Sequence, residues 1–179
     1  RTPEGGVRDV GLRLKGTHQA ENALVALGIL HWLVRSGFAI TEQNITDGLS
    51  QAFIPGRIEE LRPGLVVDGA HNEASVEALV RWLKENPRPK SRILLWGMGS
   101  GRDPIALLQP LLEHVDEIVT TRCAHPKAAD PMDLAVVIRE HCDIELSATE
   151  SIDVALEEVY READQTIVAG SLYLAGAAR

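Results

Sequence analysis

From Arg57 onward, short apolar runs alternate with segments whose apolar residues recur at helical spacing, and this alternation limits the possible folds more than any other feature. It predicts an α/β domain with a mostly parallel sheet that helices cover on both faces. The expected strands lie within residues 65–67, 93–96, 118–120, 144–146 and 166–168. The expected helical faces between them are Val76, Leu79, Val80 and Leu83; Ile105, Leu108 and Leu112; Leu134, Val137 and Ile138; and Val154, Ala155 and Val159.

The first part of the chain follows a different pattern. Val10, Leu12 and Leu14 alternate with other residues as in a strand, and a broad apolar stripe at helical spacing then follows. We expect Thr17 to cap this helix and Gly37 to end it. This part therefore predicts helical structure after a short strand.

A second helix is expected from its cap at Thr41 to about Gln51. The sequence at positions 53–56, Phe-Ile-Pro-Gly, then breaks the periodicity. We therefore place a domain boundary there and predict two parts, residues 1–54 and 55–179.

The charge and the apolar runs exclude two classes of partner. The chain has 18 basic and 26 acidic residues, a net charge of −8, which argues against nucleic acid or an anionic membrane as a partner. The longest apolar stretch, residues 23–34, is too short to span a bilayer. We therefore expect neither a nucleic-acid nor a membrane partner.

The chain has two cysteines, Cys123 and Cys142, which are too few for a disulfide framework and suit a reducing compartment. A secretory signal is not evident, so we expect a cytoplasmic protein. Together with His125 and His141, the cysteines lack the spacing of a metal finger. We therefore predict no metal site and assign these four residues to the core or the surface.

The most informative motif is Asp-Gly-Ala-His-Asn at positions 68–72, directly after the first expected strand. In open α/β sheets the carboxyl ends of the strands face the ligand crevice, so we expect Asp68 and His71 to point toward it. Asn72 can cap the helix that follows. An alternative is that Asp68 and Asn72 only stabilise the turn, and the pattern leaves both interpretations open.

Arg57 follows Pro55 and Gly56 at the expected start of a strand. A guanidinium suits phosphate because its planar fork donates two parallel hydrogen bonds to the oxygens. From the residues alone, a surface ion pair with Glu59 or Glu60 is the simpler interpretation.

Two glycine-containing segments follow later strands. Arg102 stands where the third glycine of G-x-G-x-x-G belongs, so we interpret residues 97–104 as a flexible loop and not as a dinucleotide site. Nor does the chain contain the Gly-Lys-Ser/Thr of a P-loop. At positions 170–173, Gly-Ser-Leu-Tyr precedes a helix, where Ser171 and the backbone N–H groups either bind an anion or simply cap the helix.

Together, these motifs resemble those of folylpolyglutamate synthase/dihydrofolate synthase, an ATP-dependent amide ligase of the Mur-ligase type. Their order and spacing cover nearly the whole chain. G-x-H-Q-x-x-N-A and D-G-A-H-N occur across Mur-type ligases, and G-S-L-Y favours the folate branch. The matching residues are Gly16-Thr17-His18-Gln19 with Asn22-Ala23, Pro55-Gly56-Arg57, Asp68-Gly69-Ala70-His71-Asn72 and Gly170-Ser171-Leu172-Tyr173.

The resemblance implies that residues 55–179 form the Rossmann-like C-terminal domain of such a ligase. Residues 1–54 would be the end of the central ATPase domain and the hinge. The P-loop, the Mg²⁺ ligands and most of the folate site would lie in a missing upstream region, which agrees with a chain that begins Arg-Thr-Pro. In the implied reaction, ATP activates the carboxylate of folate or dihydropteroate as an acyl phosphate, and the amino group of L-glutamate then attacks it.

The resemblance also implies roles for single residues. Asn22 would face the base of ATP, Arg57 its phosphates, and Asp68 the nucleotide from the hinge side. His71 would lie near the reacting phosphate and the incoming amino acid, so that His71 and Asp68 are the implied catalytic residues.

Ser171 and Tyr173 are the implied contacts on the glutamate side. Two positions depart from the family pattern. Where the family has a stretch like Asp-Lys-Asp, this chain has Gly-Arg-Asp, and where the family has Arg-Ala, it has Lys127 and an alanine. The first departure keeps the charge but alters the geometry, so we assign no role to Arg102. Because lysine does not replace arginine at a bidentate site, we assign none to Lys127 either.

Two other functions fit parts of the pattern. One is a Mur ligase or another amino-acid-adding relative that acts on a cell-wall precursor, which a pocket specific for diaminopimelate or peptidoglycan would favour. The other is a non-catalytic nucleotide-binding or regulatory module, which the lack of an upstream P-loop would favour.

Overall fold

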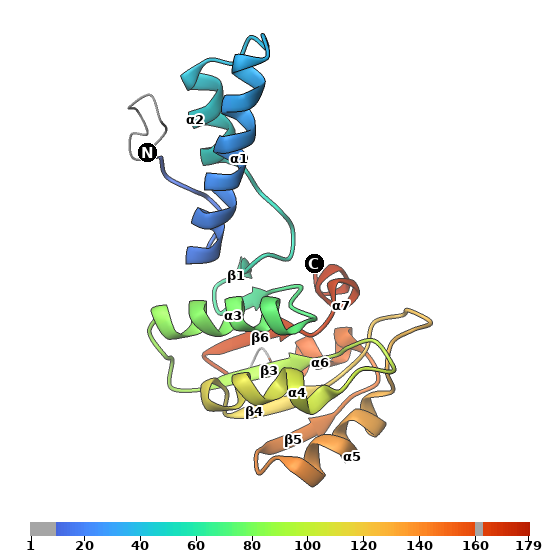
Figure 1. Cartoon of the computed structure of the whole chain (residues 1–179). Helices are drawn as coiled ribbons and strands as arrows, with labels where there is room; N and C mark the ends of the chain where they lie inside the picture. Colours follow the sequence, from blue (N-terminus) through green and yellow to red (C-terminus); the bar gives the residue numbers. More distant parts are fainter. Residues whose placement is uncertain (1–9, 160–162) are drawn as a thin grey trace. The chain divides into compact units, whose positions relative to one another are not determined.

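The computed structural model describes residues 10–159 and 163–179, and the chain divides into two compact units, residues 1–54 and 55–179 (Figure 1). We name them unit 1 and unit 2. The elements described in unit 1 are the helices α1 (Thr17–Arg35) and α2 (Glu42–Gln51).

The ends of both helices follow from their sequences, with one correction. α1 begins at Thr17, and its N-cap is Gly16, which has φ of +97° and no capping side chain, so the expected cap at Thr17 is wrong by one position. Gly37, with φ of +95°, follows the end of α1, because glycine adopts this left-handed conformation freely. At α2, the Thr41 side chain accepts a hydrogen bond from the Asn44 N–H, and the Asn44 side chain accepts one from the Thr41 N–H, a capping box.

The strand expected at Val10, Leu12 and Leu14 is not present. These three side chains are half-buried and alternate with exposed ones, but the backbone is not paired with another strand. Arg13, between them, instead places its guanidinium 4.6 Å from the centre of the Phe53 ring. The alternation of residues in the sequence therefore reflects a segment that is partly buried on one side, and not a strand that pairs with another.

α1 exposes much of its apolar surface. Gln19 is its one buried residue, whereas Leu24, Val25, Ile29 and Trp32 are each more than half exposed. Contiguous exposed apolar side chains of this kind are typical of contact surfaces.

Unit 2 is built on a six-stranded sheet in the order β1-β2-β6-β3-β4-β5. Every neighbouring pair is parallel except β1 and β2, which form an antiparallel hairpin. The predicted α/β fold with a mostly parallel sheet is thus confirmed. The strands are β1 (Glu59–Arg62), β2 (Leu65–Val67), β3 (Arg92–Trp96), β4 (Glu117–Thr120), β5 (Glu145–Ala148) and β6 (Gln165–Ala169).

Helices cover both faces of this sheet (Figure 1). Strand residues alternate between two hydrophobic cores, one shared with α3, α4, η1 and α5 and the other with α6 and α7. The alternation explains why β2 and residues 93–96 of β3 are apolar without interruption and why both strands are buried throughout. The helices are α3 (Glu73–Glu85), α4 (Pro104–Leu108), the 3₁₀ helix η1 (Gln109–His114), α5 (Pro131–His141), α6 (Ile152–Val159) and α7 (Leu172–Ala177).

The buried face of α6 differs from the one expected. Val154 is exposed, and Ile152 is buried together with Ala155 and Val159. Ile152 is the first residue of α6. The buried face therefore begins at Ile152 and not at Val154.

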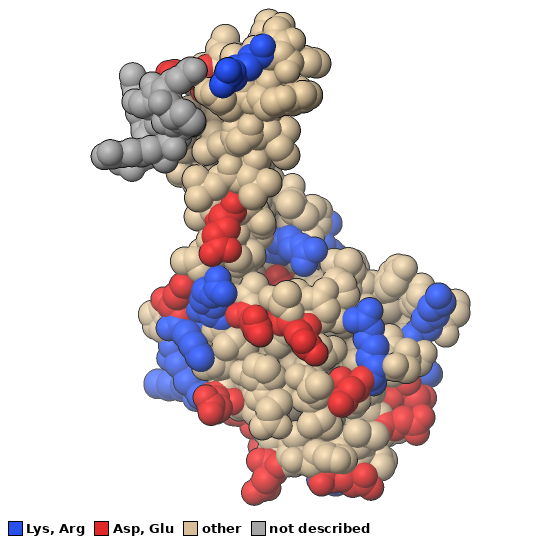
Figure 2. Space-filling view, viewed as in Figure 1, with Lys and Arg blue, Asp and Glu red and all other residues tan. Residues whose placement is uncertain are grey.

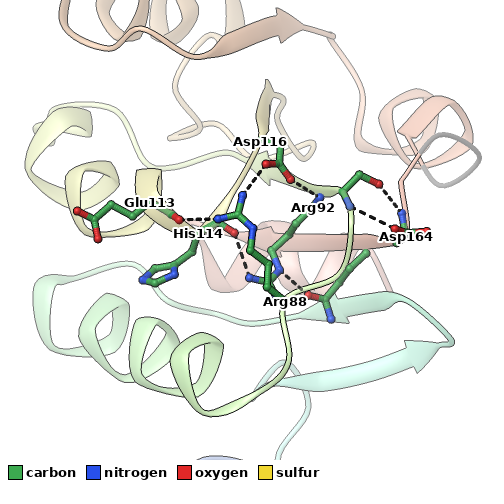
Figure 3. Close-up of polar contacts among 8 residues, drawn as sticks. Arg88, Arg92, Glu113, His114, Asp116 and Asp164 are labelled. Atoms are coloured by element: carbon green, nitrogen blue, oxygen red, sulfur yellow. Dashed lines mark hydrogen bonds and ion pairs between the residues drawn. The ribbon is translucent and has the colours of Figure 1, made fainter.

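A buried arginine lies at the amino edge of the sheet (Figure 3). The Arg92 side chain donates from Nε to Oε1 of Gln165 at 2.6 Å and from Nη1 to the carbonyl oxygen of His114 at 3.0 Å. Its backbone N–H donates to Asp116 at 2.8 Å. Burial lowers the pKa of Arg92, and the charge of Arg88 lowers it further, while Asp116 opposes both. Arg92 therefore joins the starts of β3 and β6 to the end of η1.

Neighbouring residues extend this network (Figure 3). Arg88 forms an ion pair with Asp116 at 2.5 Å and donates to the carbonyl oxygen of Glu113 at 2.8 Å. Ser91 and Asp164 exchange two hydrogen bonds, of 3.2 and 3.0 Å. The segments that precede β3, β4 and β6 are thus tied together by side chains.

Acidic and basic side chains are interspersed over unit 2 on the face that Figure 2 shows. In the part of the chain that the structure describes, no helix is both long and apolar enough to cross a membrane.

Acidification is expected to destabilise unit 2 through His114. Burial lowers the pKa of His114, and the positive charges of Lys84, Arg92 and Arg88 lower it further, against the effect of Glu113. The unfolded chain then binds a proton more readily than the folded chain. The contribution of His114 to the free energy of unfolding is therefore complete above pH of about 6.5 and is lost as the pH falls below that value.

Urea unfolding above and below pH 6.5, followed by the fluorescence of the buried Trp82 and Trp96, measures this effect. The variant His114→Gln should lose less stability on acidification than the wild type, whereas His141→Gln, at an exposed position, should lose as much as the wild type. Equal losses in wild type and His114→Gln would contradict the assignment.

Candidate functional site

A cavity of about 410 Å³ lies at the carboxyl edge of the sheet in unit 2. Its wall consists of His71 after β2 and of residues within 97–102 after β3, 122–128 after β4 and 170–174 after β6. The carboxyl ends of parallel strands are where open α/β sheets bind their ligands. We therefore take this cavity, named the first cavity, as the candidate site.

Two glycines allow the strand ends to come close together at this wall. A Cβ at Gly97 would lie 2.3 Å from the carbonyl oxygen of Thr121, and one at Gly170 would lie 2.6 Å from the carbonyl oxygen of Gly97. Gly170 also has φ of +104°. A larger residue at either position would require the backbone to move.

The loop after β3 is hydrogen-bonded along its length, in contrast to the flexible loop expected. The Ser100 N–H donates to the carbonyl oxygen of Lys127 at 2.8 Å, and the Ala129 N–H donates to that of Met98 at 2.9 Å. The loops after β3 and β4 thus form one continuous wall.

The wall of the first cavity carries positive charge. Arg102, Arg122 and Lys127 line it together with His71 and His125, and no Asp or Glu among the residues described here does. A cavity lined in this way attracts anionic ligands.

The cations of the wall differ in whether a carboxylate neutralises them. Arg122 forms ion pairs with Asp130, at 3.3 Å, and with Glu150, so two carboxylates hold its guanidinium. The Lys127 side chain is exposed and makes no hydrogen bond or ion pair with any residue of the described ranges. Although no role was assigned to Lys127 from the sequence, it lies on the wall with its ammonium group available.

His71 faces the cavity with a defined tautomer. Its Nδ1 lies 2.7 Å from the carbonyl oxygen of Gly69, and because a carbonyl only accepts, Nδ1 carries the proton. Nε2 of the neutral ring therefore keeps its lone pair. The His71 N–H donates to the Ser75 hydroxyl oxygen at 3.0 Å, and Arg102 donates to the His71 carbonyl oxygen. Hydrogen bonds therefore hold the backbone on both sides of His71.

Asp68 does not line the first cavity, although it precedes His71 by only three residues. Its carboxylate is buried and accepts the backbone N–H of Ile58 and that of Ala70, each at 2.8 Å. Ile58 has φ of +47°, an unfavourable conformation for a β-branched residue. The carboxylate thus lies within the turn, as in the turn-stabilising alternative, and not toward the cavity as expected.

Ser171 and Tyr173 both line the first cavity. The Ser171 hydroxyl caps α7 by accepting the Tyr173 N–H at 3.1 Å. The Tyr173 side chain is 61% exposed and stacks on His125, with ring centroids 3.9 Å apart and an interplanar angle of 18°. Ser171 therefore both caps α7 and lines the first cavity.

Arg57 lies two residues before β1 and is half-buried. It follows the buried Gly56, which has φ of +65°. The expected ion pair with Glu59 does not form, because Glu59 pairs with Arg179 at 3.0 Å. Arg57 has no hydrogen bond or ion pair to any other residue within the described ranges, and its guanidinium is available to a ligand.

Asn22 belongs to α1 of unit 1, whereas the cavity and the other candidate residues belong to unit 2. Its side-chain amide donates to Oε1 of Gln19 at 3.1 Å. Gln19 is buried, and its amide nitrogen lies 3.0 Å from Nε2 of His18. Three of the matching residues of the first motif, His18, Gln19 and Asn22, therefore form one hydrogen-bonded group on α1.

Two residues of the wall were missed in the sequence. Cys123 and His125 were assigned to the core or the surface, but Cys123 is both in the core and at the cavity, and His125 is in its wall. They follow β4, and the rule that selected His71 after β2 applies to every parallel strand. The position of this loop was therefore the signal that could have identified them.

The residues of the site do not fit a magnesium ion. Mg²⁺ prefers carboxylate and carbonyl oxygens, whereas the charged groups of the first cavity are cations. Among the residues that the structure describes, no three His, Cys, Asp or Glu side chains form a group that could hold a metal.

A family model for the C-terminal domain of dihydrofolate synthetase matches residues 56–178. The chain belongs to this family. The resemblance drawn from the motifs is thereby confirmed, and the sheet with its positively charged cavity lies within the matched residues.

Curated and structurally solved proteins of the dihydrofolate synthetase family are similar to the chain. The dihydrofolate synthase/folylpolyglutamate synthase of Bacillus subtilis is 36% identical over 88 residues, 48% of this chain and 20% of the relative. Folylpolyglutamate synthase of Mycobacterium tuberculosis, solved with ADP and AMPPCP, is 29% identical with a TM-score of 0.82, over 96% of this chain and 41% of that one. The bifunctional synthase of Yersinia pestis, solved with AMPPNP and a Mn ion, is 26% identical with a TM-score of 0.81, over 98% and 41%. The chain spans less than half the length of each.

Replacing Asp68 by alanine is expected to destabilise this dihydrofolate synthetase domain by about 1–3 kcal/mol. The change leaves the buried N–H groups of Ile58 and Ala70 without an acceptor and frees the strained backbone at Ile58. Thermal or urea unfolding measures the loss. Asp143→Ala, at an exposed position, should change stability by less than about 0.5 kcal/mol, and an equally small effect of Asp68→Ala would refute the structural role.

Proposed function

We propose that the chain is the C-terminal part of an ATP-dependent ligase that adds L-glutamate to dihydropteroate or a folate. Unit 2 would be its C-terminal Mur-type domain, and unit 1 the end of the central ATPase domain. Membership of the dihydrofolate synthetase family and the names of the relatives support this proposal. Its setting would be the cytoplasm, where the substrates are small molecules.

The charge of the first cavity is the observation that carries the proposal. A glutamate has two carboxylates, and the cavity offers Arg102 and Lys127 without a competing carboxylate among the described lining residues. Ser171 and Tyr173, also on the wall, would complete the amino-acid side of the site. An uncharged or cationic amino acid would gain much less from these groups.

In the proposed reaction, a carboxylate oxygen of the acceptor attacks the γ-phosphate of ATP, which gives an acyl phosphate and ADP. The glutamate nitrogen then attacks the carbonyl carbon, and phosphate leaves. The ammonium group must first lose a proton, and Nε2 of His71 has the free lone pair to take it. The bond from Nδ1 to Gly69 would hold this lone pair toward the cavity.

Nucleotide contacts would involve residues outside the cavity. Arg57 would bind the phosphates, and Asn22 would face the base. Asp68 would act as a positioning residue, because its bond to the Ile58 N–H fixes the peptide next to Arg57. The Mg²⁺ ligands would belong to the upstream region, since the residues described here do not supply them.

ADP formation tests the proposal directly. The complete protein that contains this chain should form ADP only when L-glutamate and dihydropteroate or a folate are both present. The 179-residue chain by itself should form none, because it has no Gly-Lys-Ser/Thr to hold the ATP phosphates. Glutamate-independent turnover by the complete protein, or ligation by the chain alone, would contradict the proposal.

Replacing His71 by alanine in the complete protein should lower kcat by about a hundredfold or more, the usual effect of losing a general base. Stability should fall by only about 1 kcal/mol, because one hydrogen bond is lost. Steady-state kinetics and melting curves separate the two effects. The control His141→Ala removes a histidine from the exposed face of α5 and should leave kcat unchanged. Normal turnover of a folded His71→Ala enzyme would exclude the base role.

A further inference from the structure

A second cavity adjoins the first. It has a volume of about 530 Å³ and shares Arg122, Cys123 and His125 with the first cavity, while its far side is formed by residues 150–153 at the start of α6. The two cavities thus meet at these shared residues of the loop after β4.

The ring of Tyr173 packs against this loop. It lies in the wall of the first cavity alone, whereas His125 lines both cavities. The two rings stack nearly parallel at 3.9 Å, which joins the loop after β4 to the first turn of α7. The stacked pair therefore lies where the linings of the two cavities meet.

His125 is held more firmly than its partner. Its carbonyl oxygen accepts the Ala128 N–H at 2.9 Å, its N–H donates to the carbonyl oxygen of Cys123 at 2.7 Å, and its Nδ1 accepts the Lys127 N–H at 3.2 Å. Tyr173 is 61% exposed, and among the described residues its side chain makes no hydrogen bond and stacks on no ring other than that of His125. His125 therefore sets where the Tyr173 ring lies.

We propose that the stacked pair of His125 and Tyr173 is the end wall of the amino-acid site and limits the length of the amino-acid side chain that the site accepts. The inference rests on the proposed function, because it assigns the first cavity to an amino acid. A side chain of the length of glutamate ends at the rings. A longer one must displace the rings to reach the second cavity, and it there meets Glu150 and Asp153.

Two neutral amino acids isolate the effect of length from that of charge. L-Glutamine and N5-ethyl-L-glutamine differ only by an ethyl group. The chain is titrated with each of them, and binding is measured from the changes in the backbone amide shifts of Gly99 and Ser171 in heteronuclear NMR spectra. L-Glutamate is titrated in parallel to establish binding. Poorly fitted methylene groups change affinity by roughly 10–200-fold, so the wild type should prefer glutamine by about tenfold or more.

Two variants remove the wall from opposite sides. His125→Ala and Tyr173→Ala should each reduce the preference for glutamine over its ethyl derivative by about tenfold, to near equality. His125→Phe keeps a ring on Tyr173 and should keep the wild-type preference. His141→Ala, outside both cavities, is the matched control and should also keep it. Ring-current shifts of the His125 protons, lost in Tyr173→Ala, report the stack independently of any ligand.

The outcomes are distinguishable. If L-glutamate binds and both alanine variants discriminate as strongly as the wild type, the end wall is refuted while the proposed function stands. If L-glutamate shifts no cavity amide in the wild type, the amino-acid site itself is refuted, and the wall with it. Dispersed amide spectra establish that each variant is folded, and because the two alanine substitutions lie on different elements, one folded variant is sufficient for the test.

Discussion

The close approach of three backbone segments at the carboxyl edge of the sheet determines where the walls of the first cavity stand. The Gly97 N–H donates to the carbonyl oxygen of Ala169, and the Gly170 N–H donates to that of Ala70, so the chain remains paired beyond the ends of β3 and β6. The lack of a Cβ at these glycines permits this pairing. The cations, His71 and the aromatic pair are attached to backbone that this packing holds in place.

The two edges of the sheet differ in the burial of their charged side chains. At the amino edge, the Arg92 guanidinium is buried; its Nε and Nη1 donate to an amide oxygen and a carbonyl oxygen, whereas Nη2 has no partner among the described residues. Burying a cation costs free energy unless hydrogen bonds compensate it, so this arrangement contributes order more than stability. At the carboxyl edge, Lys127 and Arg102 remain near solvent, where their charge is available to a ligand.

The sequence predicted those parts of the structure that depend on local pattern. Short apolar runs located β2, β3, β4 and β6, because the residues of a strand that is covered on both faces are mostly apolar. β1 was not predicted, since Leu61 is its only apolar residue and it pairs as an exposed hairpin. For Asp68 the motif was informative about position but not about direction, because only the fold brings the Ile58 N–H to its carboxylate. The stack of His125 and Tyr173 joins residues 48 positions apart, a contact without any local signal.

The order of the strands leaves β1 and β5 at the two margins of the sheet, each with one side of its backbone unpaired within the described chain. A free strand margin is a template on which a second chain can add its own strand. β1 carries Glu60 and Arg62 at its exposed positions, and β5 carries Glu145. Ionised side chains at these positions oppose the dry, in-register stacking of identical strands, because like charges would be repeated at every layer. The composition of both margins therefore protects the protein from aggregation, including β1, which the sequence did not reveal as a strand.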